Sequence, residues 1–144
     1  MYTHLLVPTD GSKLSDRAIK HAVTLAQQLD AKVTLFHVAP EQIWPVYAES
    51  AVMVQVSKED FRVEAKRAAK RLLEKTAKRA GGKVDTQFVF SDVPYDAIVK
   101  AAAKLKCDLV VMASHGRRGL SGFLLGSETQ KVLTHSKVPV LVVR

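Results

Sequence analysis

The chain has 144 residues, of which 47% are hydrophobic and 25% charged, and its formal net charge is +8. These proportions exclude a disordered or collagen-like chain and predict one globular domain over 1–144. No apolar run approaches the roughly 20 residues that a membrane span requires, and no signal peptide is visible. Cys107 is the only cysteine, which excludes an intrachain disulfide. We therefore expect a cytoplasmic protein that contacts no membrane.

The beginning of the chain predicts a strand followed by a helix. The apolar run 5–7 is typical of a buried strand, and it stops at the turn-forming cluster 8–12. Apolar residues then recur at helical spacing as far as Leu29, and Ser12 or Ser15 is expected to cap this helix.

The middle of the chain predicts a second strand over 32–38, a helix over 58–80 and a third strand over 84–90. Gly81 follows the helix, as glycine does at helix ends. The segment 39–57 has no clean period, and a loop of this length inside a small domain is usually functional.

The last third of the chain predicts a helix that starts near Pro94, a strand over 109–113, a helix over 127–136 and a final strand over 138–143. Strands therefore alternate with helices throughout. This order predicts a single doubly wound α/β domain, with a five-stranded parallel sheet and helices on both faces. Ligands of such folds bind at the carboxyl ends of the strands, here between strands one and four.

The helix over 58–80 carries much of the positive charge. Between Lys58 and Arg79 nine basic residues face four acidic ones, a net charge of +5. The arrangement is typical of a solvated amphipathic face, and no aromatic residues alternate with the basic ones to stack on bases. Charge alone is thus a weak argument for nucleic acid as a partner.

A glycine-rich loop joins strand four to the helix that begins near Ser127. Ser127 and Gln130 have the spacing of a capping box, so Ser127 is expected to be the N-cap. A glycine loop that leads into a helix N-terminus presents free N–H groups to an anion. The loop matches neither the P-loop nor the dinucleotide-binding motif, so the pattern alone predicts a site for phosphate or another anion.

Three stretches of the sequence resemble the universal stress protein family, and the resemblance covers essentially the whole chain. They are Val7-Pro8-Thr9-Asp10-Gly11-Ser12, then Met112-Ala113-Ser114-His115-Gly116 with Gly126-Ser127, and 138–143. ATP-binding members of the family carry G-x-x-G, nine residues, then G-Ser/Thr. The last two elements match at Gly116 and Gly126-Ser127, whereas Ala113 replaces the first glycine.

The resemblance implies the strand order 3-2-1-4-5 and a site for ATP or another adenine nucleotide, with Mg²⁺ or Mn²⁺ as an accompanying ion. Asp10 would hold the nucleotide through the ribose or a metal, Pro8, Thr9 and Val38 would frame the adenine, and Gly116, Gly126 and Ser127 would hold phosphates. The other motif residues that we place at the site are Met112, Ala113, His115, Arg117 and Glu128.

Several of these residues have competing interpretations. An Asx-turn is the alternative for Asp10, capping alone for Ser127, core packing for Val38, and turn geometry for Gly116 and Gly126. Arg117, with Arg118 beside it, is placed to screen phosphate charge or is simply solvated. Glu128 begins the helix beside the phosphates and would repel a polyphosphate unless it is turned away or bridged by a metal. His115 has no acidic partner in the pattern, so we do not assign it as a base.

The function expected from the resemblance is that of a cytoplasmic stress-response protein that binds ATP as a binding or signalling module. The alternative is a member that does not bind nucleotide and acts through protein–protein contacts, which Ala113 and Glu128 favour. A nucleotide hydrolase is a third hypothesis, with no identifiable base and at most slow hydrolysis.

Two further expectations concern the periphery. The apolar last strand is expected to lie at a sheet edge and pair with a second copy in a homodimer, unless 51–56 covers that edge. The segment 39–57 is expected to be a flap over the nucleotide or the dimer edge, with Trp44 as its fluorescence reporter.

Overall fold

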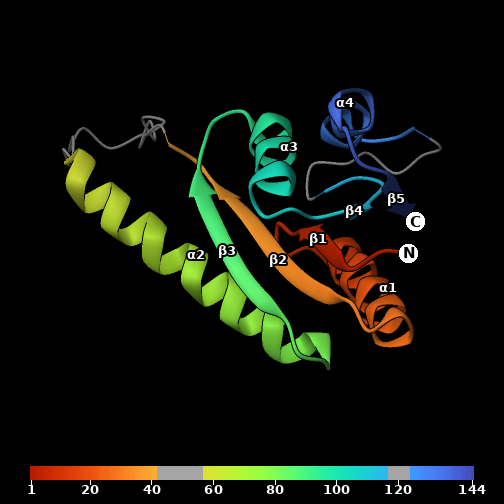
Figure 1. Cartoon of the computed structure of the whole chain (residues 1–144). Coiled ribbons are helices and arrows are strands. Elements are labelled where there is room, and N and C mark those ends of the chain that lie inside the picture. The colour runs from red at the N-terminus through yellow and green to blue at the C-terminus, as the bar shows by residue number, and fades with distance from the viewer. Residues whose placement is uncertain (42–56, 117–123) are drawn as a thin grey trace.

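Five parallel strands form one sheet in the order β3-β2-β1-β4-β5, in a computed structural model that describes residues 1–41, 57–116 and 124–144 (Figure 1). The elements in chain order are β1 (His4–Pro8), α1 (Lys13–Leu29), β2 (Lys32–Ala39), α2 (Lys58–Ala80), β3 (Asp85–Phe90), α3 (Pro94–Lys104), β4 (Leu109–Ala113), α4 (Ser127–His135) and β5 (Val140–Val143). The doubly wound fold and the strand order are confirmed.

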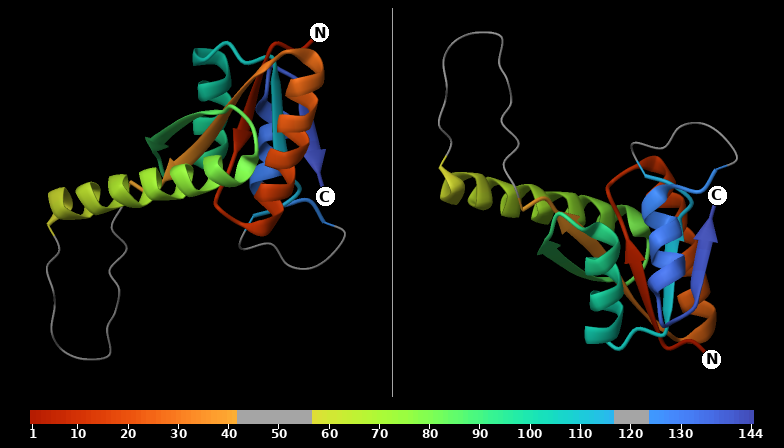
Figure 2. Two further views of the ribbon diagram at one scale, coloured as in Figure 1. Left: turned by 90° about the horizontal axis from the view of Figure 1, so that it is seen from below. Right: turned by 90° about the horizontal axis from the view of Figure 1, so that it is seen from above.

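The two central strands are buried on both faces, which explains their continuous apolar runs. Leu5, Leu6 and Val7 of β1 have no exposed surface, and every residue of β4 is buried. Successive side chains point to opposite faces, so Leu5 and Val7 join one apolar cluster and Leu6 joins the other. Helices α1 and α2 cover the first face, and α3 and α4 cover the second (Figure 2).

Most predicted element ends are confirmed. Ser12 caps α1, since its hydroxyl accepts a hydrogen bond from Ser15 N–H at 3.1 Å. Gly81 ends α2 with φ +74°, a conformation that favours glycine. The last strand starts at Val140 and not at the predicted residue 138. Val138 N–H donates to Ser136 Oγ at 3.2 Å and Pro139 has no N–H to donate, so only the Pro139 carbonyl contacts β4, where it accepts from Val110 N–H at 3.0 Å.

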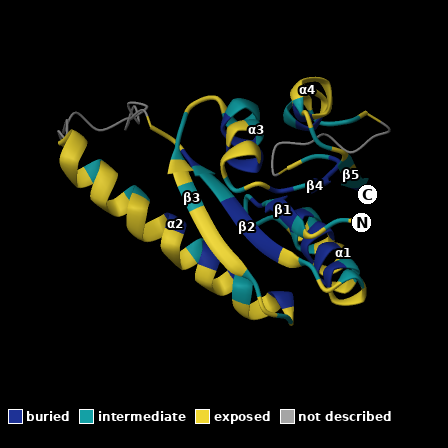
Figure 3. Ribbon diagram, in the orientation of Figure 1, coloured by how far each residue is buried: buried dark blue, intermediate teal, exposed yellow. Residues whose placement is uncertain are grey.

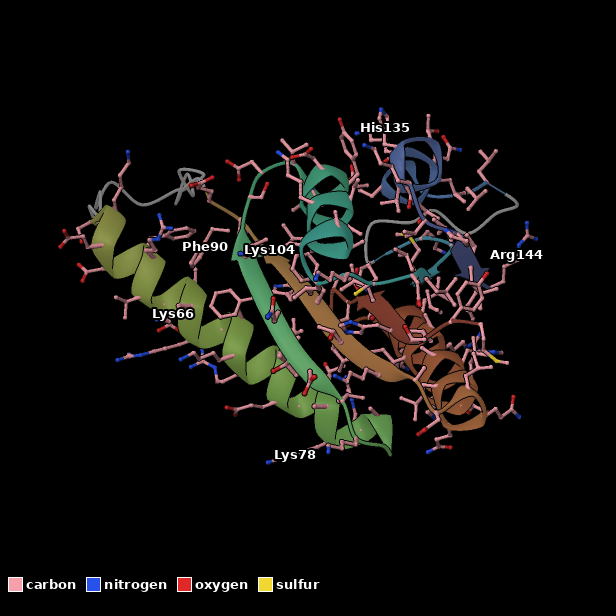
Figure 4. The ribbon with its side chains drawn as sticks, in the orientation of Figure 1. Lys66, Lys78, Phe90, Lys104, His135 and Arg144 are labelled. Atoms are coloured by element: carbon pink, nitrogen blue, oxygen red, sulfur yellow. The ribbon has the colours of Figure 1, made fainter. Side chains whose placement is uncertain are left out.

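Helix α2 projects beyond the sheet, and its N-terminal half is exposed (Figure 3). Its buried residues begin only at Ala69. On the side of β3 that faces this helix, Phe90 lies with the Arg62 guanidinium 4.6 Å from its ring centre (Figure 4). This contact joins the exposed half of α2 to the end of β3.

Two observations bear on the expectations from composition. Cys107 is buried, and burial together with the neighbouring Asp108 raises the pKa of its thiol to about 11. Across the described ranges, no helix is long and apolar enough to cross a membrane.

The Asp108 carboxylate ties the beginning of β1 to that of β4. It accepts hydrogen bonds from Thr3 N–H at 2.8 Å, Thr3 Oγ1 at 2.7 Å and His4 N–H at 3.0 Å. Burial acts to raise the pKa of Asp108, but the hydrogen bonds from His4 and Thr3 outweigh it and leave the pKa below its usual range.

A carboxylate with a lowered pKa stabilises the fold above its unfolded pKa of about 3.9 and loses that contribution as the pH falls through the folded value. We expect Asp108→Asn to lower the free energy of unfolding by about 1–2 kcal/mol at pH 7, because two backbone donors lose a charged acceptor. The deficit should shrink below about pH 4. Urea unfolding from pH 7 to pH 2.5 tests this, with Asp85→Asn at the exposed β3 edge as control. A deficit independent of pH would contradict it.

Candidate functional site

The carboxyl ends of β1 and β4 form the point in the sheet where the strand order reverses. The turn after β1 and the loop after β4 meet there. A Cβ atom added at Gly116 would lie 2.5 Å from Oδ2 of Asp10, so the carboxylate rests directly on the glycine backbone. The structure thus brings together the two motif residues that sequence analysis placed on separate segments.

The turn after β1 is held by its own polar groups. Asp10 Oδ1 accepts a hydrogen bond from Ser12 N–H at 2.9 Å, and Gly11 has φ +76°. The Thr9 hydroxyl is buried, where it accepts from Gly11 N–H at 3.1 Å and lies 3.1 Å from Ser15 Oγ. The Thr9 side chain therefore builds the turn. Its backbone is engaged as well, since Thr9 N–H donates to Phe36 O at 2.9 Å and Thr9 O lies 2.9 Å from Nδ1 of His37, so only a second acceptor position on the Thr9 carbonyl is left for the predicted contact with adenine.

The two ends of the glycine loop touch at a narrow neck. Gly126 N–H donates to Ser114 O at 2.8 Å. A Cβ atom at Gly126 would lie 3.0 Å from Cα of His115, closer than side chains normally pack. Because φ of Gly126 is −60°, close approach and not an unusual backbone conformation requires glycine at this position.

The N-terminus of α4 differs from the expected capping box. The N-cap is Gly126, whose carbonyl accepts from Gln130 N–H at 3.0 Å, and Ser127 is the first helical residue. The Gln130 side chain donates to Leu125 O at 3.3 Å and not to the cap. The prediction of Ser127 as N-cap was therefore wrong, because close packing at the neck places glycine there.

This correction leaves polar groups at the start of α4 available. Ser127 is exposed, and within residues 1–41, 57–116 and 124–144 its hydroxyl makes no hydrogen bond. The N–H groups of Ser127, Glu128 and Thr129 belong to the first turn, where a helix has no internal acceptors. Free N–H groups and the positive end of the helix dipole favour an anion at this position.

Thr129 anchors this N-terminus, and sequence analysis missed it. Its side chain is buried, and Oγ1 donates to Ala113 O at 2.9 Å, which fixes α4 on the end of β4. The available signal was its spacing, since Thr129 lies three residues before the buried Val132 and so shares its helix face.

The Glu128 carboxylate is turned toward α3. Its Oε2 accepts a hydrogen bond from Tyr95 N–H at 2.9 Å, and its Oε1 lies 3.2 Å from Lys131 Nζ. Helix α3 starts after Val93, which provides no side-chain cap. Glu128 therefore supplies the missing acceptor at the N-terminus of α3, so its backbone N–H, not its carboxylate, faces the predicted phosphate position.

The residues expected around the adenine ring lie on adjacent strands. Pro8 pairs in register with Phe36, and Val38 follows on the same neighbouring strand. Val38 and Met112 pack in the cluster beneath α3 and α4, whereas the Ala113 methyl packs in the cluster on the α1 side. Val38 and Met112 thus share one face of the sheet, whereas Ala113, which replaces the first glycine of the family motif, faces the other.

A cavity of about 470 Å³ lies beside the loop neck. Its lining residues are Leu14, Arg17, Ser114, His115, Leu124, Leu125 and Arg144. Ser114 Oγ and His115 Nδ1 are 3.0 Å apart, but Ser114 is only 5% exposed and is poorly placed to attack a substrate. Arg117, Arg118 and Trp44 lie outside the described residues, as does the segment 51–56.

Metal ligands do not gather in the described ranges, where no three His, Cys, Asp or Glu side chains are grouped to hold an ion. Mg²⁺ and Mn²⁺ are commonly held by one or two carboxylates together with substrate phosphates. Asp10 suits that arrangement only if the nucleotide supplies the remaining ligands.

Comparisons with known proteins identify the family of the chain. The universal stress protein family model matches residues 1–144. Universal stress protein MJ0531 of Methanocaldococcus jannaschii is 35% identical, with 100% of this chain and 83% of that protein aligned. The solved structure of MJ0577, from the same organism, superimposes with a TM-score of 0.80 at 32% identity, covering 99% of this chain and 96% of the other. A universal stress protein solved in complex with cAMP has a TM-score of 0.71 at 28% identity, covering 99% and 97%. The chain belongs to the universal stress protein family.

Proposed function

We propose that this protein binds an adenine nucleotide between the ends of β1 and β4 and acts as a binding or signalling module in the cytoplasmic stress response. The observation that carries the proposal is the close approach of the Asp10 carboxylate to Gly116, which brings the group that we propose binds ribose or a metal onto the loop that we propose binds phosphate. The complex of a 28% identical family member with cAMP supports the choice of an adenine ligand.

In this proposal each group has a distinct task. The first-turn N–H groups of α4 and the Ser127 hydroxyl bind phosphate, and Asp10 accepts hydrogen bonds from the ribose or holds a phosphate-bound Mg²⁺ or Mn²⁺. Pro8, Val38 and the Thr9 backbone contact the base. The ion would neutralise phosphate charge.

The proposal includes at most slow hydrolysis of the bound nucleotide and no other catalysis. A nucleotide hydrolase requires a group within hydrogen-bond reach of the attacking water. The Ser114 hydroxyl is buried, and His115 lies beside the cavity on the α1 side of the neck. The arrangement therefore favours binding over turnover.

Calorimetric titration with AMP, ADP and ATP, each with and without Mg²⁺, tests the proposal. We expect saturable heat and a rise in melting temperature with at least one of these nucleotides. No heat and no thermal shift at millimolar concentrations would overturn it and favour a member of the family that acts through protein–protein contacts.

We further propose a homodimer that pairs the β5 edges of two copies. Strand β5 ends the sheet, and Leu141 on it is 41% exposed. An apolar edge strand with free N–H and C=O groups favours pairing with another chain. Antiparallel pairing about a two-fold axis would satisfy both edges.

We expect Leu141→Asp to convert the dimer to a monomer at tens of micromolar, because it places two charges in the paired edge. The matched control is Val89→Asp at the opposite edge of the sheet, where Val89 is 38% exposed on β3. Sedimentation equilibrium measures the mass. A monomeric wild type, or a dimer that Leu141→Asp leaves intact, would contradict the proposal.

A further inference from the structure

An acidic side chain stands in the helical turn that we propose binds phosphate. Glu128 is the second residue of α4, one position after Ser127. Its carboxylate is held by Tyr95 N–H at 2.9 Å and by Lys131 Nζ at 3.2 Å. Because the first contact caps another helix, swinging the carboxylate into solvent would leave the N-terminus of α3 without its acceptor. The negative charge is therefore fixed near the start of α4.

The described surroundings neutralise this charge only in part. Lys131 is the one basic side chain in the described ranges that forms an ion pair with Glu128, and its own side chain is 50% exposed. The nearby Asp96 carboxylate is paired with Lys100 at 2.6 Å. A solvent-exposed ion pair of this kind is weak, because water also screens each charge, so Lys131 does not hold its ammonium group tightly enough to cancel the charge of Glu128.

The fixed charge lies close enough to act on bound phosphates. A helical turn rises about 5.4 Å, so a side chain on the first turn and an anion bound by the first-turn N–H groups are separated by about one turn along the helix axis. That distance is comparable to the Debye length of about 8 Å at physiological ionic strength. Repulsion therefore grows with each phosphate that extends from the first.

We propose that Glu128 is a specificity-determining residue that disfavours polyphosphates, so that this site binds adenosine monophosphates in preference to ATP. The inference rests on the proposed function and names the ligand class of that same site. Glu128 holds α3 through its carboxylate oxygen and discriminates between nucleotides through its charge. These two roles are separable by substitution.

The separating variant is Glu128→Gln. Its amide oxygen still accepts the hydrogen bond from Tyr95 N–H, but the negative charge is gone. Glu128→Ala removes both the charge and the cap, and is expected to lower the melting temperature. Glu74→Gln removes an exposed carboxylate on α2 and is the control for net charge.

The experiment is calorimetric titration of the wild type and the three variants with adenosine, AMP, ADP and ATP, without divalent ions, at 0.15 M salt. We expect the wild type to bind AMP more tightly than ATP. Glu128→Gln should tighten ATP binding by roughly three- to tenfold, AMP binding by less and adenosine binding not at all, as expected for a screened charge at this distance. Glu74→Gln should match the wild type, and raising the salt concentration should reduce the gain.

Three results would overturn the inference alone. The first is an equal change in affinity for all four ligands in Glu128→Gln, which would indicate positioning without charge discrimination. The second is weaker ATP binding in that variant. The third is a wild type that binds ATP more tightly than AMP. Failure of the wild type to bind any of the four compounds at millimolar concentration would instead overturn the proposed function, and this inference with it.

Discussion

Gly116→Ala is expected to lower the affinity for adenine nucleotide by roughly 10- to 100-fold, the loss that follows when a charged hydrogen-bonding group is displaced. The added methyl carbon would lie 2.5 Å from Asp10 Oδ2. Asp10 is not free to yield, because its Oδ1 accepts the Ser12 N–H at 2.9 Å and so forms part of the turn before α1. Either the carboxylate or the loop must move, and each movement separates the two halves of the site.

Titration with AMP, together with a melting curve, distinguishes loss of the site from loss of the fold. The control is Gly81→Ala at the end of α2. Gly81 has an unusual backbone conformation, with φ +74°, but nothing lies within 4 Å of its added Cβ. It should lower stability by about 1 kcal/mol and leave affinity unchanged. Wild-type affinity in Gly116→Ala would contradict the proposed role of the Asp10 contact.

Gly126→Val is expected to open the neck of the glycine loop. The first added carbon already meets His115 Cα and Cβ at 3.0 Å and Ser114 O at 3.3 Å, and valine adds two further methyl groups. Forcing extra carbons into such a contact costs about 1–3 kcal/mol. The hydrogen bond from Gly126 N–H to Ser114 O would be strained as well. We therefore expect lower stability together with a loss of nucleotide binding of more than about tenfold.

Urea unfolding and AMP titration of Gly126→Ala and Gly126→Val form a graded test. Alanine should be intermediate, because a single methyl group requires the neighbours to yield by only a few tenths of an ångström. The structure places the added side chain against His115. Wild-type stability together with wild-type affinity in Gly126→Val would contradict the claim that the neck of the glycine loop shapes the nucleotide site.

The fold was predictable because the apolar runs and the helix-end residues agree with the order of strands and helices along the chain. The continuous apolar runs of β1 and β4 indicate strands covered on both faces, and the alternation with helices indicates parallel pairing. Ser12 and Gly81 mark helix ends through local chemistry, namely a side-chain cap and a left-handed backbone. Such signals depend on a few neighbouring residues, so the sequence alone reveals them.

The details at α4 were not predictable, because tertiary contacts determine them. The pattern around Ser127 fits a capping box, but the approach of Gly126 to His115 makes glycine the cap. Glu128 reads as a first-turn acid, yet its partner is Tyr95, 33 positions away in the sequence. The Thr129 contact with Ala113 likewise joins residues 16 positions apart. No local pattern specifies which distant donor or acceptor such a side chain meets.

The most direct test of the central claim is an amide chemical-shift titration of ¹⁵N-labelled protein with AMP. The account predicts that the perturbed amides cluster at Gly11, Ser12, Gly116 and 126–129, where the turn after β1 meets the start of α4. Amides of Thr3, His4 and Asp108, at the amino ends of β1 and β4, should stay unchanged and are the internal control. Perturbations centred on those residues or on α2, with the turn and the start of α4 unaffected, would contradict the account.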